Sequence, residues 1–131
     1  MSDERLDAIR ARAAAATPGP WRWYGIRSNQ DIRLMSGAVA WRSEVMGFQR
    51  WGTQHAEPVF RNPEPGGKWF IPTRDICKFE VCPDCIDPKD PRVYRDNVIA
   101  LRHPDAEFIA AARADVDYLL SVIDKMTTDG Q

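Results

Sequence analysis

The chain has 131 residues, of which 44% are hydrophobic and 28% charged, and its formal net charge is −1. This length fits a single domain, and the composition is typical of a globular protein rather than a disordered one. The small net charge gives no general attraction to nucleic acid or to a membrane surface. No apolar run approaches the ~20 residues of a membrane span, and the acidic, polar N-terminus does not resemble a signal peptide. We therefore expect one cytoplasmic domain without a membrane partner.

Charge is distributed unevenly along the chain. Residues 21–61 contain six arginines and three carboxylates, a local net charge of +3, whereas residues 105–131 contain six carboxylates and two basic residues, a local net charge of −4. These segments could complement each other within one subunit or between two. The odd number of cysteines argues against a disulfide framework.

The first 17 residues are predicted to form a helix. Ser2 is the expected N-cap, and acidic residues follow it at the positive end of the helix dipole. The apolar residues recur at a spacing of three to four, which gives a narrow apolar stripe. Residues 18–20, Pro-Gly-Pro, end this helix because proline lacks the required N–H and clashes with the preceding turn.

Residues 21–72 are predicted to be rich in strands, since aromatic and apolar side chains alternate there with polar ones. The expected strands are residues 21–24, 31–35, 38–41, 44–48, 59–61 and 69–71. The Pro- and Gly-rich residues 62–67 predict a loop.

The last third of the chain is predicted to contain a cysteine-bearing loop insertion (73–95), a last strand (96–102) and a helix (104–127). Pro104 suits the first position of this helix. Its apolar residues follow a 3–4–3–4–3 spacing: Ile109, Ala112, Val116, Leu119, Ile123 and Met126.

These elements predict an α+β fold, with a mostly antiparallel sheet of about five strands packed on one face against the N- and C-terminal helices. The apolar stripe of the second helix is expected to pack in the core; alternatively, it pairs with its copy in another subunit. The open face or an edge of the sheet is left for a partner, which favours a homo-oligomer.

The sharpest local motif is Cys82-Pro83-Asp84-Cys85, because two thiolates at this spacing can face one tetrahedral zinc ion. Cys77 is a third candidate ligand, and His103 (or His55) is a candidate for the fourth. The alternative is three reduced thiols in a loop. A Cys-x-x-Cys redox role would need a thioredoxin-like βαβ context, which the sequence lacks.

Tryptophan and arginine are interleaved in the strand-rich segment. Aromatic faces stack on bases and guanidinium groups fork onto phosphates, and the same residue types dominate protein interfaces. The alternative places the tryptophans in the core with the arginines covering them. The candidate ligand-binding residues are Phe48, Arg50, Trp51, His55, Phe60 and Arg61.

No catalytic motif is evident, and we expect that the chain is not an enzyme. Neither histidine lies in a nucleophile, metal or acid–base motif. Asp115 and Asp117 are two residues apart on a helix and point in different directions. There is no dinucleotide-binding or P-loop pattern.

Three stretches carry a resemblance to known proteins. Residues 15–21 (AATPGPW) and 103–113 (HPDAEFIAAAR) resemble small proteins of actinobacterial phages and prophages, which are distantly similar to the Ead/Ea22-like group of temperate-phage accessory proteins. Residues 45–61 (VMGFQRWGTQHAEPVFR) resemble the centre of that phage family. The cysteine-bearing insertion departs from the family pattern. The resemblance implies a phage early or accessory gene product and no established activity.

Three functional hypotheses follow. The first is a phage-encoded accessory protein, active in host interaction or anti-defence, that binds a nucleotide-type messenger or a host protein in the host cytoplasm. The second is a zinc-stabilised nucleic-acid-binding module. The third is a phage structural or assembly component.

Overall fold

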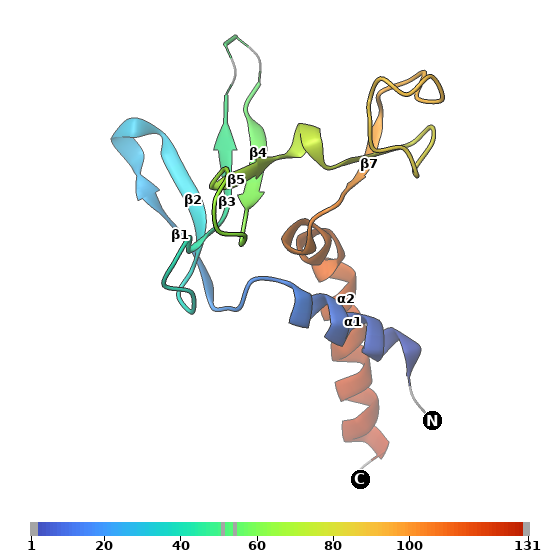
Figure 1. Ribbon diagram of the computed structural model, residues 1–131. Helices are drawn as coiled ribbons and strands as arrows, with labels where there is room; N and C mark the ends of the chain where they lie inside the picture. The colour runs from blue at the N-terminus through green and yellow to red at the C-terminus, as the bar shows by residue number, and fades with distance from the viewer. Residues whose placement is uncertain (1–2, 51, 54, 130–131) are drawn as a thin grey trace.

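A computed structural model of the chain describes residues 3–50, 52–53 and 55–129. It confirms the α+β prediction, because the chain forms a five-stranded antiparallel sheet together with an N-terminal and a C-terminal helix (Figure 1). In chain order the elements are α1 (Glu4–Ala15), β1 (Trp21–Ile26), the 3-10 turn η1 (Arg27–Asn29), β2 (Asp31–Ser36), β3 (Glu44–Gln49), β4 (Glu57–Arg61), β5 (Phe70–Pro72), the 3-10 turn η2 (Thr73–Asp75), β6 (Cys77–Phe79), β7 (Val98–Leu101) and α2 (Pro104–Asp129).

The five-stranded sheet is a meander with the order β1-β2-β3-β4-β5. Residues that lie directly opposite each other in neighbouring strands share one face of a sheet. The pairing places one apolar row across all five strands: Trp23, Leu34, Met46, Phe60 and Ile71. We call the face that carries this row the apolar sheet face.

The predicted strand at residues 38–41 does not form, and residues 37–43 are a loop instead. Ser36 closes this loop, since its backbone N–H donates to the carbonyl of Ser43 (2.7 Å) and its side-chain oxygen accepts from the N–H of Ala38 (3.2 Å). Arg42 also has a φ of 49°, in the left-handed region that extended strands do not use. Local side-chain and backbone chemistry therefore overrides the apolar pattern.

The cysteine-bearing insertion is more regular than predicted. Its first residues form β6, which pairs antiparallel with β7 in a separate two-stranded sheet. The last strand is thus confirmed at residues 98–101, although it does not join the main sheet.

α1 begins at Asp3, whose carboxylate accepts hydrogen bonds from the backbone N–H groups of Arg5 (2.9 Å) and Leu6 (3.2 Å). The N-cap is therefore Asp3, one residue after the predicted Ser2, which lies outside the described residues. Two polar contacts bind α1 to α2. Arg12 donates twice to the buried Asp115 (2.7 and 3.2 Å), and the Tyr118 hydroxyl donates to Asp3.

The helices do not lie across the sheet as the sequence predicted. They pack on each other and extend away from one end of the sheet (Figure 1). The junction is made by two ring contacts, Trp21 with Phe108 (5.3 Å between centroids) and Phe60 with His103 (5.1 Å). None of the described helices is both long and apolar enough to cross a membrane.

Candidate binding surface

A cluster of two tryptophans around one arginine lies where the loops 37–43 and 62–69 meet. Arg42 is only 7% exposed, and one of its terminal nitrogens donates to three backbone carbonyls, those of Asn62 (2.8 Å), Glu64 (2.9 Å) and Lys68 (3.2 Å). Three acceptors on one nitrogen hold the guanidinium in a single position. The arginine thereby fixes the course of a loop that contains no regular structure.

The same guanidinium lies against two indole rings. Its central carbon is 4.4 Å from the ring centroid of Trp41 and 5.0 Å from that of Trp69, within cation–π range. The two rings are 6.4 Å apart. Trp41 is nevertheless 46% exposed and Trp69 57% exposed. The cluster therefore presents two indoles to solvent, and the buried guanidinium of Arg42 contacts both rings on the side away from solvent.

A shallow groove adjoins this cluster. A hollow of about 310 Å³ is lined by Gln49, Lys68, Trp69, Phe70 and Pro72. Gln49 and Phe70 also line a second hollow of about 180 Å³, which is therefore next to the first. We call the combined area the Trp41–Trp69 surface; it comprises Trp41, Arg42, Gln49, Lys68, Trp69 and Phe70.

The charged groups beside the second hollow are engaged with one another. Arg33 donates to both carboxylate oxygens of Asp31 (2.7 and 2.8 Å) and also to Glu44. Glu44 is buried, and this desolvation raises its pKa, with Arg33 only partly offsetting the effect. Hydrogen bonding to Asp31 raises the pKa of Arg33. The guanidinium of Arg33 is thus already hydrogen-bonded to two carboxylates of the same chain.

The six predicted ligand-binding residues do not form one site. Phe48 is exposed and lines the second hollow. Phe60 is buried against His103, and Arg61 donates to the carbonyl of Arg42 (2.8 Å). Arg50 and His55 are exposed near the end of the β3–β4 hairpin, and Trp51 lies outside the described residues. The structure places a cluster of exposed aromatic residues around an arginine at Trp41, Arg42 and Trp69 instead.

The predicted zinc ligands are not arranged around a common point. Cys82 and Cys85 form a disulfide, which corrects both the expectation of reduced thiols and the proposed zinc pair. A turn in which the N–H of Cys85 donates to the carbonyl of Cys82 brings their Cα atoms within 5.4 Å, inside the range for a disulfide. Cys77 is a free thiol that donates to the carbonyl of Thr73 (3.0 Å).

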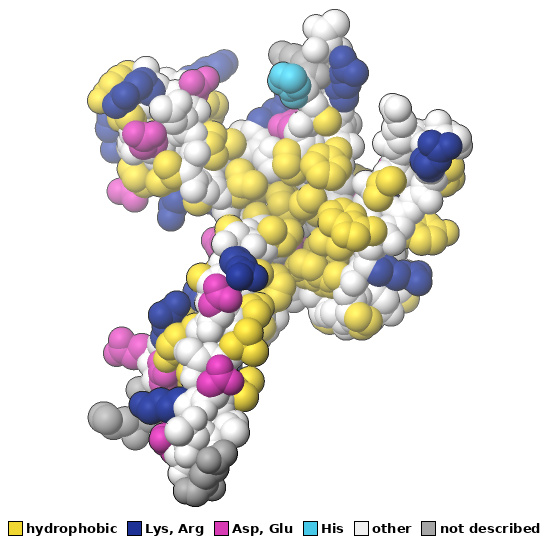
Figure 2. All heavy atoms as spheres, turned by 180° about the vertical axis from the view of Figure 1, so that it is seen from behind, with side chains coloured by type: hydrophobic (Ala, Val, Ile, Leu, Met, Phe, Trp, Pro, Cys, Tyr) yellow, Lys and Arg dark blue, Asp and Glu magenta, His cyan; other side chains and the backbone are white. Residues whose placement is uncertain are grey.

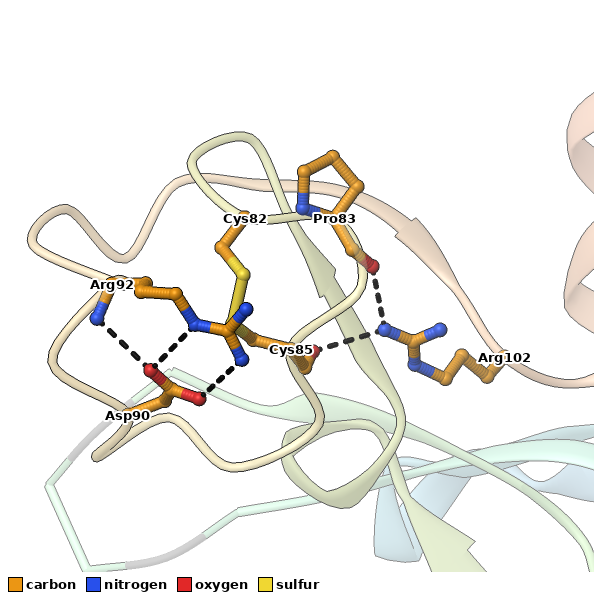
Figure 3. Close-up of a disulfide and its surroundings, with 6 residues drawn as sticks. All are labelled: Cys82, Pro83, Cys85, Asp90, Arg92 and Arg102. Atoms are coloured by element: carbon orange, nitrogen blue, oxygen red, sulfur yellow. Dashed lines mark hydrogen bonds and ion pairs between the residues drawn. A yellow bond between two sulfur atoms is a disulfide. The ribbon is translucent and has the colours of Figure 1, made fainter.

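Polar contacts hold the disulfide loop in place (Figure 3). Arg102 donates to the carbonyls of Pro83 (2.8 Å) and Cys85 (3.0 Å), and Arg92 pairs with Asp90 (3.0 Å). Within the described ranges, no group of three or more His, Cys, Asp or Glu side chains could hold a metal ion.

The fourth predicted zinc ligand, His103, is instead hydrogen-bonded to backbone groups through both ring nitrogens. Its Nδ1 accepts the backbone N–H of Asp105 (3.1 Å), so in the neutral ring Nε2 carries the proton and donates to the carbonyl of Arg61 (2.7 Å). Asp105 is 1% exposed and accepts from both the N–H (2.6 Å) and the hydroxyl (2.7 Å) of Thr17. This junction fixes the end of α1, the start of α2 and β4 together.

Sequence reasoning missed this junction, although its residues lie in the segments 15–21 and 103–113 that carry the resemblance to phage proteins. A threonine before Pro-Gly-Pro and an aspartate after His-Pro were the available signals. Comparison with protein-family models, with curated proteins and with solved structures finds no match to this chain.

Proposed function

We propose that the chain is a non-enzymatic binding protein that engages a protein partner through the Trp41–Trp69 surface. One observation supports this most strongly: two exposed indoles are held in fixed positions by a buried guanidinium. Tryptophan is enriched among the few residues that carry most of the energy of a protein interface. Rings that are already ordered lose little conformational entropy when a partner binds.

The polar groups favour a protein over a nucleotide-type messenger as the ligand. A phosphate needs cationic donors that are not already paired. Both guanidinium groups are already bonded, Arg42 to three carbonyls and Arg33 to two carboxylates, which leaves Lys68 as the cation at the groove. The carboxylate of Glu44 beside the second hollow would also repel a phosphate. A mixed-charge, aromatic groove instead suits the backbone and apolar side chains of a polypeptide.

The buried titratable groups support a binding role over catalysis. Both ring nitrogens of His103 are hydrogen-bonded to backbone groups, and both carboxylate oxygens of Asp105 are bonded to Thr17. These groups serve the junction between the helices and the sheet. If the resemblance to phage accessory proteins holds, the partner is a host protein in the host cytoplasm.

Site-specific photo-crosslinking tests the proposal. Benzoylphenylalanine in place of Lys68, at the rim of the groove, should capture one protein in the cells where the chain is naturally produced. The same probe at Tyr94, an exposed aromatic position on the cysteine-bearing loop, is the matched control and should not capture it. Equal capture at both positions, or none at Lys68, would contradict a partner at this surface.

A second measurement separates the two ligand classes. Calorimetric titration with a panel of mononucleotides, dinucleotides and cyclic nucleotides should give no heat of binding at micromolar concentration. Saturable nucleotide binding that the Trp69→Ala variant loses would replace the protein partner with a nucleotide at the same surface. Recovery of the chain in purified virions would instead favour a structural or assembly role.

The role of Arg42 can be tested apart from the rings it holds. Arg42→Lys keeps a positive charge but loses the planar group that contacts three carbonyls and two indoles. We expect partner affinity to fall although both tryptophans are retained. Arg92→Lys, on the cysteine-bearing loop, is the control and should bind as the unmodified chain does.

A further inference from the structure

The chain exposes more surface than a compact monomer of its size. Its solvent-accessible area is 9691 Å², whereas a folded monomer of 14.9 kDa is expected to expose about 7,000 Å². The excess is about 2,700 Å² per chain. Figure 2 shows hydrophobic side chains gathered at the centre of the molecule and along the projecting helix.

Part of this apolar surface lies on α2. One side of the helix is covered by α1 through Asp115 and Tyr118. A second, apolar stripe lies roughly 110° round the helix axis from Asp115, because an α-helix has 3.6 residues per turn. Its members are 40–55% exposed and are spaced by seven, four and three residues: Ile109, Val116, Leu120 and Ile123. We call them the free α2 stripe.

The remainder lies on the apolar sheet face. The apolar row that crosses the five strands is covered at Phe60, which is 3% exposed and stacks on His103. At the β1 end of the row, Trp23 is 63% exposed. Ile32, two residues from Leu34 on the same strand and therefore on the same face, is 50% exposed. Phe108 of α2 contacts β1 at Trp21, the first residue of the strand, and the face beyond it at Trp23 and Ile32 is left open.

We propose that a second copy of the chain covers both surfaces, with the α2 helix of each copy lying on the apolar sheet face of the other. A two-fold pair of this kind is self-complementary and closed. Pairing of α2 with its own copy would bury the free α2 stripe but leave the apolar sheet face exposed. The reciprocal arrangement buries both at once.

The dimensions of the two surfaces agree. The free α2 stripe spans 14 residues from Ile109 to Ile123, or about 21 Å. The apolar sheet face measures about 20 Å along a six-residue strand, and its part away from the covered Phe60, from β1 to β3, is about 10 Å across, close to the diameter of a helix. If each copy buries most of its excess of about 2,700 Å², the total falls in the range of 2,000–5,000 Å² that is typical of obligate homodimers.

Charge also favours this arrangement. Asp105 and Asp115 are buried within the chain, so the exposed charged residues of α2 have a net charge of −2, and the segment 21–61 that contains four of the five strands has +3. Laying the acidic helix of one copy against the basic sheet of the other brings opposite charges together at the rim of the interface.

Analytical ultracentrifugation of the full chain tests the self-association. The unmodified chain should sediment as a dimer at micromolar concentration. Leu120→Glu and Trp23→Glu should raise the dimer dissociation constant at least 100-fold, because each places a carboxylate in the buried centre of the interface.

Each variant has a neighbour as its control. Ser121→Glu lies on the polar side of α2, and Tyr24→Glu lies on the opposite face of β1 at nearly the same exposure as Trp23, 60% against 63%. Both controls should remain dimeric. All four substituted positions are exposed to solvent, so circular dichroism should show that every variant stays folded. A monomeric unmodified chain, or equal weakening by variants and controls, would overturn the proposal.

Crosslinking tests the arrangement of the two copies. When chains carrying Ile32→Cys are mixed with chains carrying Leu120→Cys, a short bismaleimide should join the two different chains. Joining of two Leu120→Cys chains to each other would show that the helices pair, and would overturn the reciprocal arrangement. In a chain that carries both Ile32→Cys and Leu120→Cys, a crosslink between the two cysteines of the same chain would also overturn the reciprocal arrangement. The Trp41–Trp69 surface lies outside this interface, so partner binding can fail or succeed independently of dimerisation.

Discussion

Replacement of Asp105 by alanine should destabilise the protein more than replacement of any other carboxylate of α2. Its carboxylate is 1% exposed and accepts two hydrogen bonds from Thr17 at 2.6 and 2.7 Å. Asp105→Ala leaves a buried N–H and a buried hydroxyl without their acceptor. Each such loss costs ~1–3 kcal/mol, so the free energy of unfolding should fall by about 2–6 kcal/mol.

Thermal and urea unfolding at a fixed protein concentration measure this loss. For a chain of this length, each kcal/mol corresponds to about 3–4 °C in Tm, which predicts a decrease of roughly 6–24 °C. Asp105→Asn keeps one acceptor and should lose less. Glu107→Ala, an exposed acid in the same turn of α2, is the control and should change stability by less than about 0.5 kcal/mol. A loss below about 1 kcal/mol for Asp105→Ala would refute the junction as a main tie between helices and sheet.

Three further predictions concern titration and thiol chemistry. The hydrogen bond from Tyr118 lowers the pKa of Asp3 below 3.8 and raises that of Tyr118 above 10. The unmodified chain should therefore exceed Tyr118→Phe in stability at neutral pH, and this difference should shrink both above pH 10 and below pH 3.8; a constant difference would contradict the contact. Burial raises the pKa of Glu44 above 4.5, so its ionisation should lower stability as pH rises through the window above 4.5, and Glu44→Gln should remove that slope from urea midpoints. A slope identical in both proteins would contradict the burial of this carboxylate. Titration of thiols after unfolding should give one thiol per chain without reductant and three with it, whereas three in both cases, together with bound zinc, would restore the zinc site.

The fold class could be predicted because local pattern and tertiary structure agree over most of the chain. Alternation identified β1, β2 and β3, and Pro18 and Pro104 marked the end of α1 and the start of α2. The apolar pattern wrongly predicted a strand at residues 38–41. Ser36 donates one hydrogen bond to Ser43 and accepts another from Ala38, and these bonds, with the left-handed conformation of Arg42, prevent a strand there.

The candidate site was harder to predict because it depends on contacts between distant segments. That tryptophan and arginine occur together is visible in the sequence. Which arginine lies between which tryptophans depends on the loop 62–69 folding back onto Arg42. The disulfide was missed because an odd cysteine count argues against a disulfide framework but not against one local turn that pairs Cys82 with Cys85.

The affinity of the crosslinked partner for variants of the Trp41–Trp69 surface tests the central claim most directly. Titration of the purified partner should show that Trp41→Ala and Trp69→Ala each weaken binding by about 30-fold or more, the consequence of losing ~2 kcal/mol at an interface hot spot. Tyr94→Ala should bind as tightly as the unmodified chain. Equal affinity for all three variants would contradict the proposal that the two indoles are the binding surface.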